Sequence, residues 1–196
     1  NLLETIVLQS EILDLKVANQ GRAVGVVIES GVESGKGAVA TILITEGQLK
    51  KGDLIIAGEE FGKARILMNE NNQELDFVTP SMPVRVFGLS STPKSGDEMR
   101  AVRNEKQGKE ISSLRKDRNR ANKLNDQQLL KVKNFLEEPM DSSTTKISLI
   151  VKADVQGSVE AIRDSLLKLS TDEVEVDIIS SGVGGISESD INLASA

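Results

Sequence analysis

The stretch KISLIVKADVQGSVEAI, residues 146–162, decides the fold of the C-terminal part of this chain. It begins as an apolar run and breaks at residues 153–157, which read ADVQG. Residues 158–169 then place apolar side chains at helical spacing, and residues 174–179 form a second apolar run. The order strand, loop, helix, strand predicts a βαβ unit with parallel strands.

Two features of this unit could bind an anion, and each also has a structural interpretation. The loop at 154–158 precedes a helix, whose first N–H groups attract anions, but Asp154 repels an anion and can itself cap the helix. The glycine cluster at 182–185 partly imitates a dinucleotide fingerprint but lacks its spacing. We therefore expect a cap at Asp154 and a flexible turn at the glycines. Ser187 is expected to cap a last helix, with Asp190 in its first turn.

Composition restricts the chemistry that the chain can perform. Its 196 residues include no Cys and no His, which excludes disulfides, thiolate or imidazole metal ligands and triads built on His. Aromatic residues make up 2%, so aliphatic side chains must form the core and few rings can stack on bases. No apolar run approaches the roughly 20 residues of a membrane span, and no signal peptide is visible. We expect a soluble, cytoplasmic monomer.

Charge is unevenly distributed along the chain. The net charge is −6, yet residues 104–134 hold 9 basic and 4 acidic side chains. A basic segment between two acidic modules suggests contact with a polyanion such as RNA, and the candidate contact residues are Arg115, Lys116, Arg118, Arg120 and Lys123. The alternative is a solvated helix that links two domains. We favour the solvated helix, because no aromatic ring lies nearby in the sequence to stack on bases.

Residues 10–103 carry the signals of a small closed β-barrel. Short apolar or alternating runs recur between Gly-containing turns, and closure would protect the edges of such apolar strands. The expected strands lie at 12–17, 24–28, 39–45, 54–56, 63–68, 83–89 and 98–102. Residues 1–9 and 126–137 show helical spacing. Residues 105–123 have almost no apolar face and are expected to form a charged, solvated helix, and residues 137–145 are expected to be a polar linker.

Several motifs imitate active sites without meeting their requirements. The segment GVESGKG, residues 31–37, resembles a phosphate loop, but its first glycine is one residue too close and a glycine replaces the Mg²⁺-binding Ser or Thr. It is expected to be a hairpin turn. The acidic pairs Glu59-Glu60, Glu137-Glu138 and Asp172-Glu173 are sequence neighbours, which do not face one another on a helix or strand. We predict no catalytic, cofactor-binding or metal-binding residues.

The amino-acid sequences of several stretches resemble those of one protein family. Residues 21–28 (GRAVGVVI) and 46–53 (EGQLKKGD) resemble the second domain of translational GTPases, the elongation-factor-Tu type of barrel. Residues 88–98 resemble the last strands of that barrel in bacterial translation initiation factor two, a large GTPase. Residues 1–9 resemble the last helix of the family's GTP-binding domain, and residues 146–196 resemble the start of its third, α/β domain.

The resemblance implies a middle fragment of a multidomain protein. Its domains would be a terminal helix (1–9), the barrel (10–103), a charged helical linker (104–145) and a truncated α/β domain (146–196). The parent protein would deliver formylated initiator tRNA to the small ribosomal subunit and promote subunit joining with GTP hydrolysis. GTP and Mg²⁺ would bind in the missing upstream domain, and the tRNA would bind through missing downstream domains. The fragment itself would be non-catalytic, with no cofactor, and would dock on the ribosome and couple the flanking domains.

Two other functions remain open at this point. The first is an RNA-binding module that acts through the basic linker. The second is a small-molecule-binding α/β domain that uses residues 154–158 and 182–185.

Overall fold

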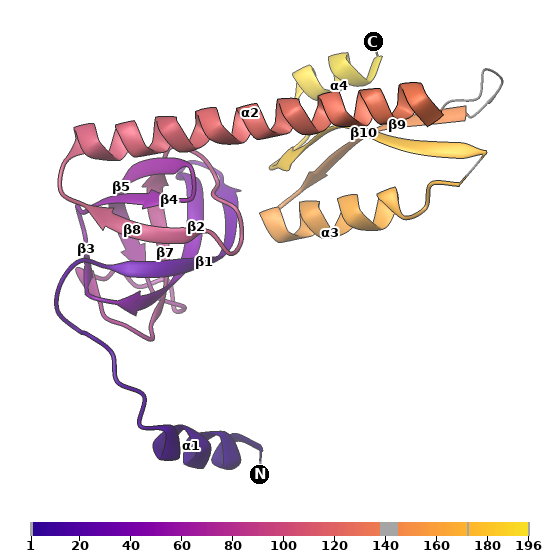
Figure 1. Cartoon of the computed structure of the whole chain (residues 1–196). Coiled ribbons are helices and arrows are strands. Elements are labelled where there is room, and N and C mark those ends of the chain that lie inside the picture. The colour runs from indigo at the N-terminus through magenta and orange to yellow at the C-terminus, as the bar shows by residue number, and fades with distance from the viewer. Residues whose placement is uncertain (1, 138–144, 172, 196) are drawn as a thin grey trace.

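A computed structural model describes residues 2–137, 145–171 and 173–195 (Figure 1). The first part of the chain forms helix α1 and a barrel, and the long helix α2 leads from the barrel to an α/β module. The elements are α1 (Leu2–Leu13), β1 (Val24–Glu33), β2 (Gly37–Glu46), β3 (Leu49–Lys50), β4 (Leu54–Ala57), β5 (Glu60–Met68), β6 (Phe77–Val78), β7 (Pro83–Leu89), β8 (Glu98–Val102), α2 (Glu105–Glu137), β9 (Thr145–Ala153), α3 (Gln156–Leu167), β10 (Val174–Val183) and α4 (Glu188–Ser195).

The predicted barrel is confirmed. Its strands close in the order β1-β2-β7-β5-β4-β8, and every neighbouring pair is antiparallel. Alternation along β2 sends Ala40, Ile42 and Ile44 into the core, where they meet Leu67 and Met99 with no exposed surface. The segment at 31–37 is the hairpin between β1 and β2, as expected.

Two glycines allow β5 and β7 to cross closely. A Cβ on Gly62 would lie 2.2 Å from the carbonyl oxygen of Gly88. Gly88 has a φ of +114°, and a Cβ there would lie 2.2 Å from the carbonyl oxygen of Lys63. The register between the two strands shifts between Gly62 and Ile66. Close backbone approach therefore requires residues without a side chain at this crossing.

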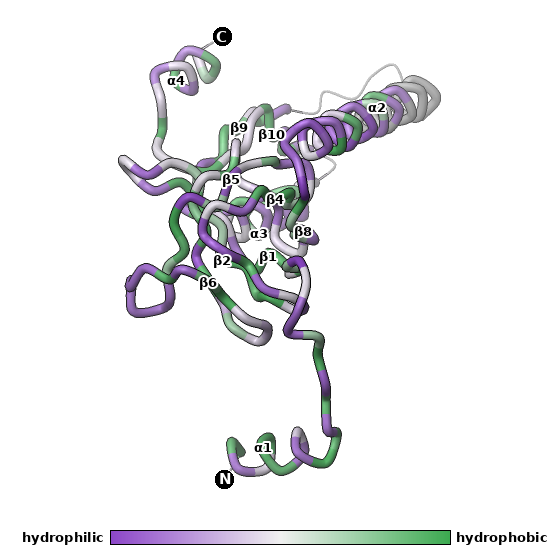
Figure 2. Tube along the Cα trace, turned by 90° about the vertical axis from the view of Figure 1, so that its left-hand side faces the viewer, coloured by the Kyte–Doolittle hydropathy of each residue, from purple (hydrophilic) through white to green (hydrophobic). Residues whose placement is uncertain are grey.

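The expected strand at residues 12–17 is wrong. Helix α1 continues to Leu13 and ends beside Asp14, whose φ is +42°, and no strand forms before β1. The apolar residues of α1 are exposed, and the helix lies apart from the barrel in both views (Figures 1 and 2). A short alternating pattern becomes a strand only where a neighbouring strand can pair with it, and no strand lies beside this segment.

The two helices expected in the basic segment form one continuous helix. Helix α2 has 33 residues and is therefore about 50 Å long. Asn104 caps it by accepting a hydrogen bond from the N–H of Gln107 at 2.7 Å. Figure 2 shows that most of the helix is hydrophilic. Among the described helices, none combines the length and apolar character that crossing a membrane requires.

The predicted parallel βαβ unit is confirmed, but its cap is not at Asp154. Strands β9 and β10 are parallel, and α3 connects them. The N-cap residue of α3 is Val155 in an extended conformation, with no side-chain hydrogen bond to the helix. Asp154 lies one residue too early to cap α3, so the structure corrects that expectation. The Ser187–Asp190 cap of α4 is present, since each residue accepts a hydrogen bond from the backbone N–H of the other.

Candidate functional site

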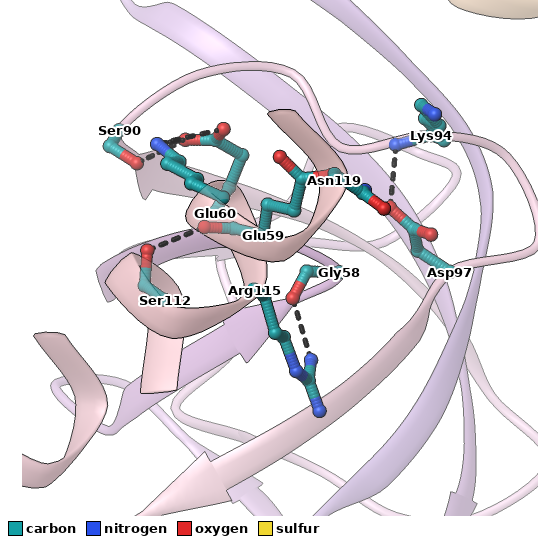
Figure 3. A network of polar contacts seen from close by, with 10 residues as sticks. Gly58, Glu59, Glu60, Ser90, Lys94, Asp97, Ser112, Arg115 and Asn119 are labelled. Carbon is teal, nitrogen blue, oxygen red and sulfur yellow. Dashed lines mark hydrogen bonds and ion pairs between the residues drawn. The ribbon is translucent and has the colours of Figure 1, made fainter. Parts of the chain in front are cut away.

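Helix α2 is attached to the turn between β4 and β5 by a row of polar contacts (Figure 3). Ser112 Oγ donates to the carbonyl oxygen of Glu59 at 2.5 Å, and Arg115 Nη1 donates to the carbonyl oxygen of Gly58 at 2.6 Å. The side-chain amide of Asn119 donates to the carboxylate of Glu59. The helix thus satisfies backbone acceptors of the turn that no strand partner reaches.

An ion pair lies beside these hydrogen bonds. Lys116 Nζ lies 3.1 Å from the carboxylate of Glu60, which also accepts a hydrogen bond from Ser90 Oγ at 2.5 Å. The side chain of Lys116 is 46% exposed and that of Glu60 is 13% exposed. Water reaches one side of the pair, so salt can screen it.

Gly108 gives the helix room to approach the barrel. A Cβ on Gly108 would lie 2.2 Å from the ring of Phe61. Phe61 pairs with Ile56, so the two side chains lie on the same face of the sheet. Ile55 and Ala57, on either side of Ile56, point into the core, so this face is the outer one, and Ile56 is only 3% exposed there. Gly108, Ser112, Arg115 and Asn119 follow one another at helical spacing on the face toward the barrel. We call these four residues and Lys116, with residues 58–61 in the β4–β5 turn and at the start of β5, the α2 seam.

The five cations predicted to contact RNA do not act as one group. Arg115 and Lys116 belong to the α2 seam. Arg118 and Arg120 are exposed and make no hydrogen bond or ion pair within the described part of the chain. The side chain of Lys123 lies outside the described residues. Helical geometry places Arg118 on the other side of α2 from Lys116 and Arg120, because each of them is two residues from Arg118, a rotation of about 200° around the helix axis.

A second candidate region lies at the carboxyl ends of β9 and β10. A hollow of about 750 Å³ opens there, lined mainly by apolar or backbone atoms of residues such as Val32, Ile150, Gly184 and Ile191. Gly184 and Gly185 of the predicted glycine cluster line it, and so does Asp154. In the described ranges, no group of three or more acidic side chains could hold a metal ion.

The charged groups of this hollow are paired with each other. Lys152 Nζ lies 3.1 Å from the carboxylate of Asp190. The hydroxyl and backbone N–H of Ser187 also donate to Asp190, at 2.7 and 2.9 Å. These hydrogen bonds from Ser187, followed by that from Lys152, lower the pKa of Asp190 to about 2. The arrangement fixes α4 against β9 and leaves few polar atoms to bind a ligand.

The barrel and the α/β module meet directly at β1. Gly31 forms an isolated antiparallel bridge with Val155, and a Cβ on Gly31 would lie 3.0 Å from the carbonyl oxygen of Asp154. Beside this contact, Glu33 accepts from Arg85 and pairs with Lys36 at 3.1 Å. Hydrogen bonds with Lys36 and then Arg85 lower the pKa of Glu33. The module therefore contacts the barrel at this bridge, while helix α2, which precedes the module in the chain, contacts the barrel at the α2 seam.

Comparison with known proteins relates the two folded parts to two families. Residues 22–102 match the family model described as elongation factor G domain 2. Residues 121–196 match the one described as translation-initiation factor 2. The chain is 49% identical over all 196 residues to translation initiation factor IF-2 of Buchnera aphidicola subsp. Schizaphis graminum (strain Sg). The chain belongs to the translation initiation factor 2 family. It covers 23% of the length of that relative.

Two solved structures are similar to the chain at lower identity. One is GDP-bound aIF5B from Aeropyrum pernix, with 24% identity and a TM-score of 0.48, covering 97% of this chain and 31% of that one. The other is a bacterial selenocysteine-specific elongation factor, with 15% identity and a TM-score of 0.42, covering 50% and 18% respectively.

The five residues that α2 contributes to the seam lie between the regions that match the two family models, whereas residues 58–61 lie inside the barrel match. The barrel match ends at residue 102 and the initiation factor match begins at residue 121. Sequence reasoning missed the seam, because it treated Glu59-Glu60 only as a possible acid–base pair. The signal that could have found it is the spacing of the small residues Gly108 and Ser112 on an otherwise charged helix.

Proposed function

We propose that this chain is the part of a translation initiation factor that docks on the small ribosomal subunit and couples the domains on either side. The observation that carries the proposal is the 49% identity to a translation initiation factor along the whole chain. In this proposal residues 1–9 end a GTP-binding domain, residues 10–103 are the docking barrel, residues 104–145 are the linker, and residues 146–196 begin the third domain.

The complete protein would be a cytoplasmic GTPase. Its upstream domain would bind GTP and Mg²⁺, and its downstream domains would bind formylated initiator tRNA and promote subunit joining. The part described here would perform none of this chemistry. Residues 31–37 form a hairpin and lack a complete phosphate loop, which supports the assignment of GTP binding to another domain.

Two binding measurements test the proposal. Labelled chain should bind small ribosomal subunits saturably, be displaced by unlabelled chain, and bind large subunits at least about tenfold more weakly, a difference of roughly 1.4 kcal/mol. The same chain should show no Mg²⁺-dependent binding of a fluorescent GTP analogue at micromolar concentrations. Equal binding to both subunits would contradict the docking role. Micromolar binding of the nucleotide would contradict the assignment of GTP binding to the upstream domain.

A second candidate function is direct RNA binding by α2. The exposure of Arg118 and Arg120, both without a partner in the described residues, favours it. If these cations contact phosphates, replacing each one should reduce the slope of log affinity against log salt by about 0.7–0.9. A slope unchanged by both substitutions would leave docking by the barrel as the explanation of ribosome binding.

A further inference from the structure

We propose that the α2 seam is a detachable polar latch, which holds α2 on the barrel and thereby sets the position of the α/β module. In the docked state the seam is closed. In the released state α2 leaves the β4–β5 turn while the barrel and the helix both stay folded. The helix side of the seam, residues 108–119, lies between the two regions that match family models, which end at residue 102 and begin at residue 121.

The seam fits α2 to the barrel in one specific position. Gly108 lies against Phe61, where any side chain would collide with the ring. Ser112, which is 7% exposed, and Arg115 reach two successive carbonyl groups of the turn. Small residues and directed hydrogen bonds at helical spacing select one docked position of α2, which a general charge attraction would not do.

The specific contacts of the seam are polar, and those of Arg115 and Lys116 are near water, whereas those of Ser112 and Asn119 are partly buried. Three hydrogen bonds and one ion pair join α2 to the turn, and the ion pair is partly exposed. Water can replace such contacts with little net loss, and exposed ion pairs contribute little to stability. The seam can therefore open without the large loss that opening the aliphatic barrel core would cause.

Few other contacts hold α2 on the barrel. Among the described residues, all hydrogen bonds and ion pairs between α2 and the barrel fall within residues 112–119. The remaining residues of α2, 120–137, extend for about 27 Å beyond them. A small change of angle at the seam therefore becomes a large displacement at the end of the helix, where the α/β module follows (Figure 1). The bridge between Gly31 and Val155 is a second contact, between the barrel and the module, that opening must strain or break.

The absence of cysteine makes the latch directly measurable. We suggest single-molecule energy transfer between dyes on Asn71→Cys, in an exposed barrel loop, and Asn125→Cys, on α2 beyond the seam. At low salt we expect mainly one efficiency, that of the docked state. Raising NaCl from about 0.01 to about 1 M shortens the Debye length from about 30 to about 3 Å and should increase a second, lower-efficiency population.

Two seam variants should open the latch at constant salt. Glu59→Ala/Glu60→Ala removes the carboxylates that hold Asn119 and Lys116 and should raise the ratio of released to docked molecules at least about tenfold, or roughly 1.4 kcal/mol. Gly108→Val should do the same by colliding with Phe61. The matched control is Glu110→Ala/Asp117→Ala, which removes the same two charges from the opposite face of α2 and should leave the ratio unchanged.

The proposal is overturned if both seam variants give the wild-type distribution at every salt concentration, or if the control shifts the distribution as much as Glu59→Ala/Glu60→Ala. Circular dichroism of each variant must show an intact barrel. If Gly108→Val fails this check, the Glu59→Ala/Glu60→Ala variant and its control decide the outcome alone.

Discussion

The barrel and the α/β module bury their aliphatic side chains to very different extents. In the barrel, closure surrounds Ile42, Leu67 and Met99 so that none of them has exposed surface. In the module, only Val151 and Val159 among the described hydrophobic residues are buried, and Ile147 and Ile179 remain about half exposed. Both parts have regular hydrogen bonding, so the comparison teaches that pairing of strands alone does not make a core. The barrel covers its own strands, whereas a two-stranded parallel sheet needs further layers.

The largest expected effect is on folding of the separate parts. Residues 10–103 should give a well-dispersed amide spectrum and a cooperative denaturant transition, because the barrel core is closed. Residues 146–196 should give neither, because two strands and their helices bury too little apolar surface. Amide spectra and guanidinium titrations of both pieces check this, with the whole chain as reference. A cooperative transition in the C-terminal piece would remove the basis of the comparison.

The next effect concerns two glycines, one in each part. Gly62→Ala should destabilise the barrel by about 1–3 kcal/mol, because the added Cβ would collide with the backbone of Gly88. Gly157→Ala should stabilise α3 by a few tenths to about 1 kcal/mol, since a Cβ there meets nothing within 4 Å. Denaturant titrations monitored separately in each part measure both changes. The idea fails if the two substitutions shift stability in the same direction.

A smaller effect is the pH dependence of α4. The folded pKa of Asp190 is about 2, below its ordinary value of 3.8, so ionised Asp190 stabilises the folded module above pH 4. That contribution should be lost as the pH falls from about 4 to about 2, because protonation weakens the bonds from Ser187 and Lys152. Amide exchange in α4 against pH measures it. Asp190→Asn should flatten the profile and the exposed control Glu188→Gln should retain it; a wild-type midpoint near 3.8 would argue against the cap and the ion pair.

The smallest expected effect is that of Arg118→Glu/Arg120→Glu on binding to the small subunit. We expect little change, because we assign the ribosomal contacts to the barrel and regard these arginines as solvating α2. Binding measured across a salt titration, with helicity checked by circular dichroism, provides the test. A loss of more than about tenfold, or roughly 1.4 kcal/mol, with helicity intact would transfer the docking role from the barrel to α2.

Local patterns predicted those parts of the fold that depend on neighbours in sequence. The alternation in β2, the break before α3 and the Ser187–Asp190 cap were all recognisable, because each reflects interactions over a few residues. The expected strand at 12–17 did not form. Its alternation satisfies the pattern, but a strand requires a partner, and pattern alone does not reveal whether a partner is present.

The cap at Asp154 failed for a similar reason. Capping depends on which residue takes the extended conformation just before the first helical turn, and that residue is Val155. The backbone there is also paired with Gly31, which lies more than a hundred residues earlier in the chain. The start of α3 therefore depends on a contact with the barrel, beyond the reach of local reasoning.

The sequence by itself determined the two folded parts, the helix between them and the kinds of residue available for binding, because periodicity and composition are properties of short stretches. Only the tertiary structure decided which cations are engaged. Arg115 and Lys116 meet Gly58 and Glu60, more than fifty residues away, whereas Arg118 and Arg120 extend into solvent. The physical reason is that hydrogen bonds and ion pairs act over about 3 Å, and only the closed barrel brings the β4–β5 turn within that distance of α2.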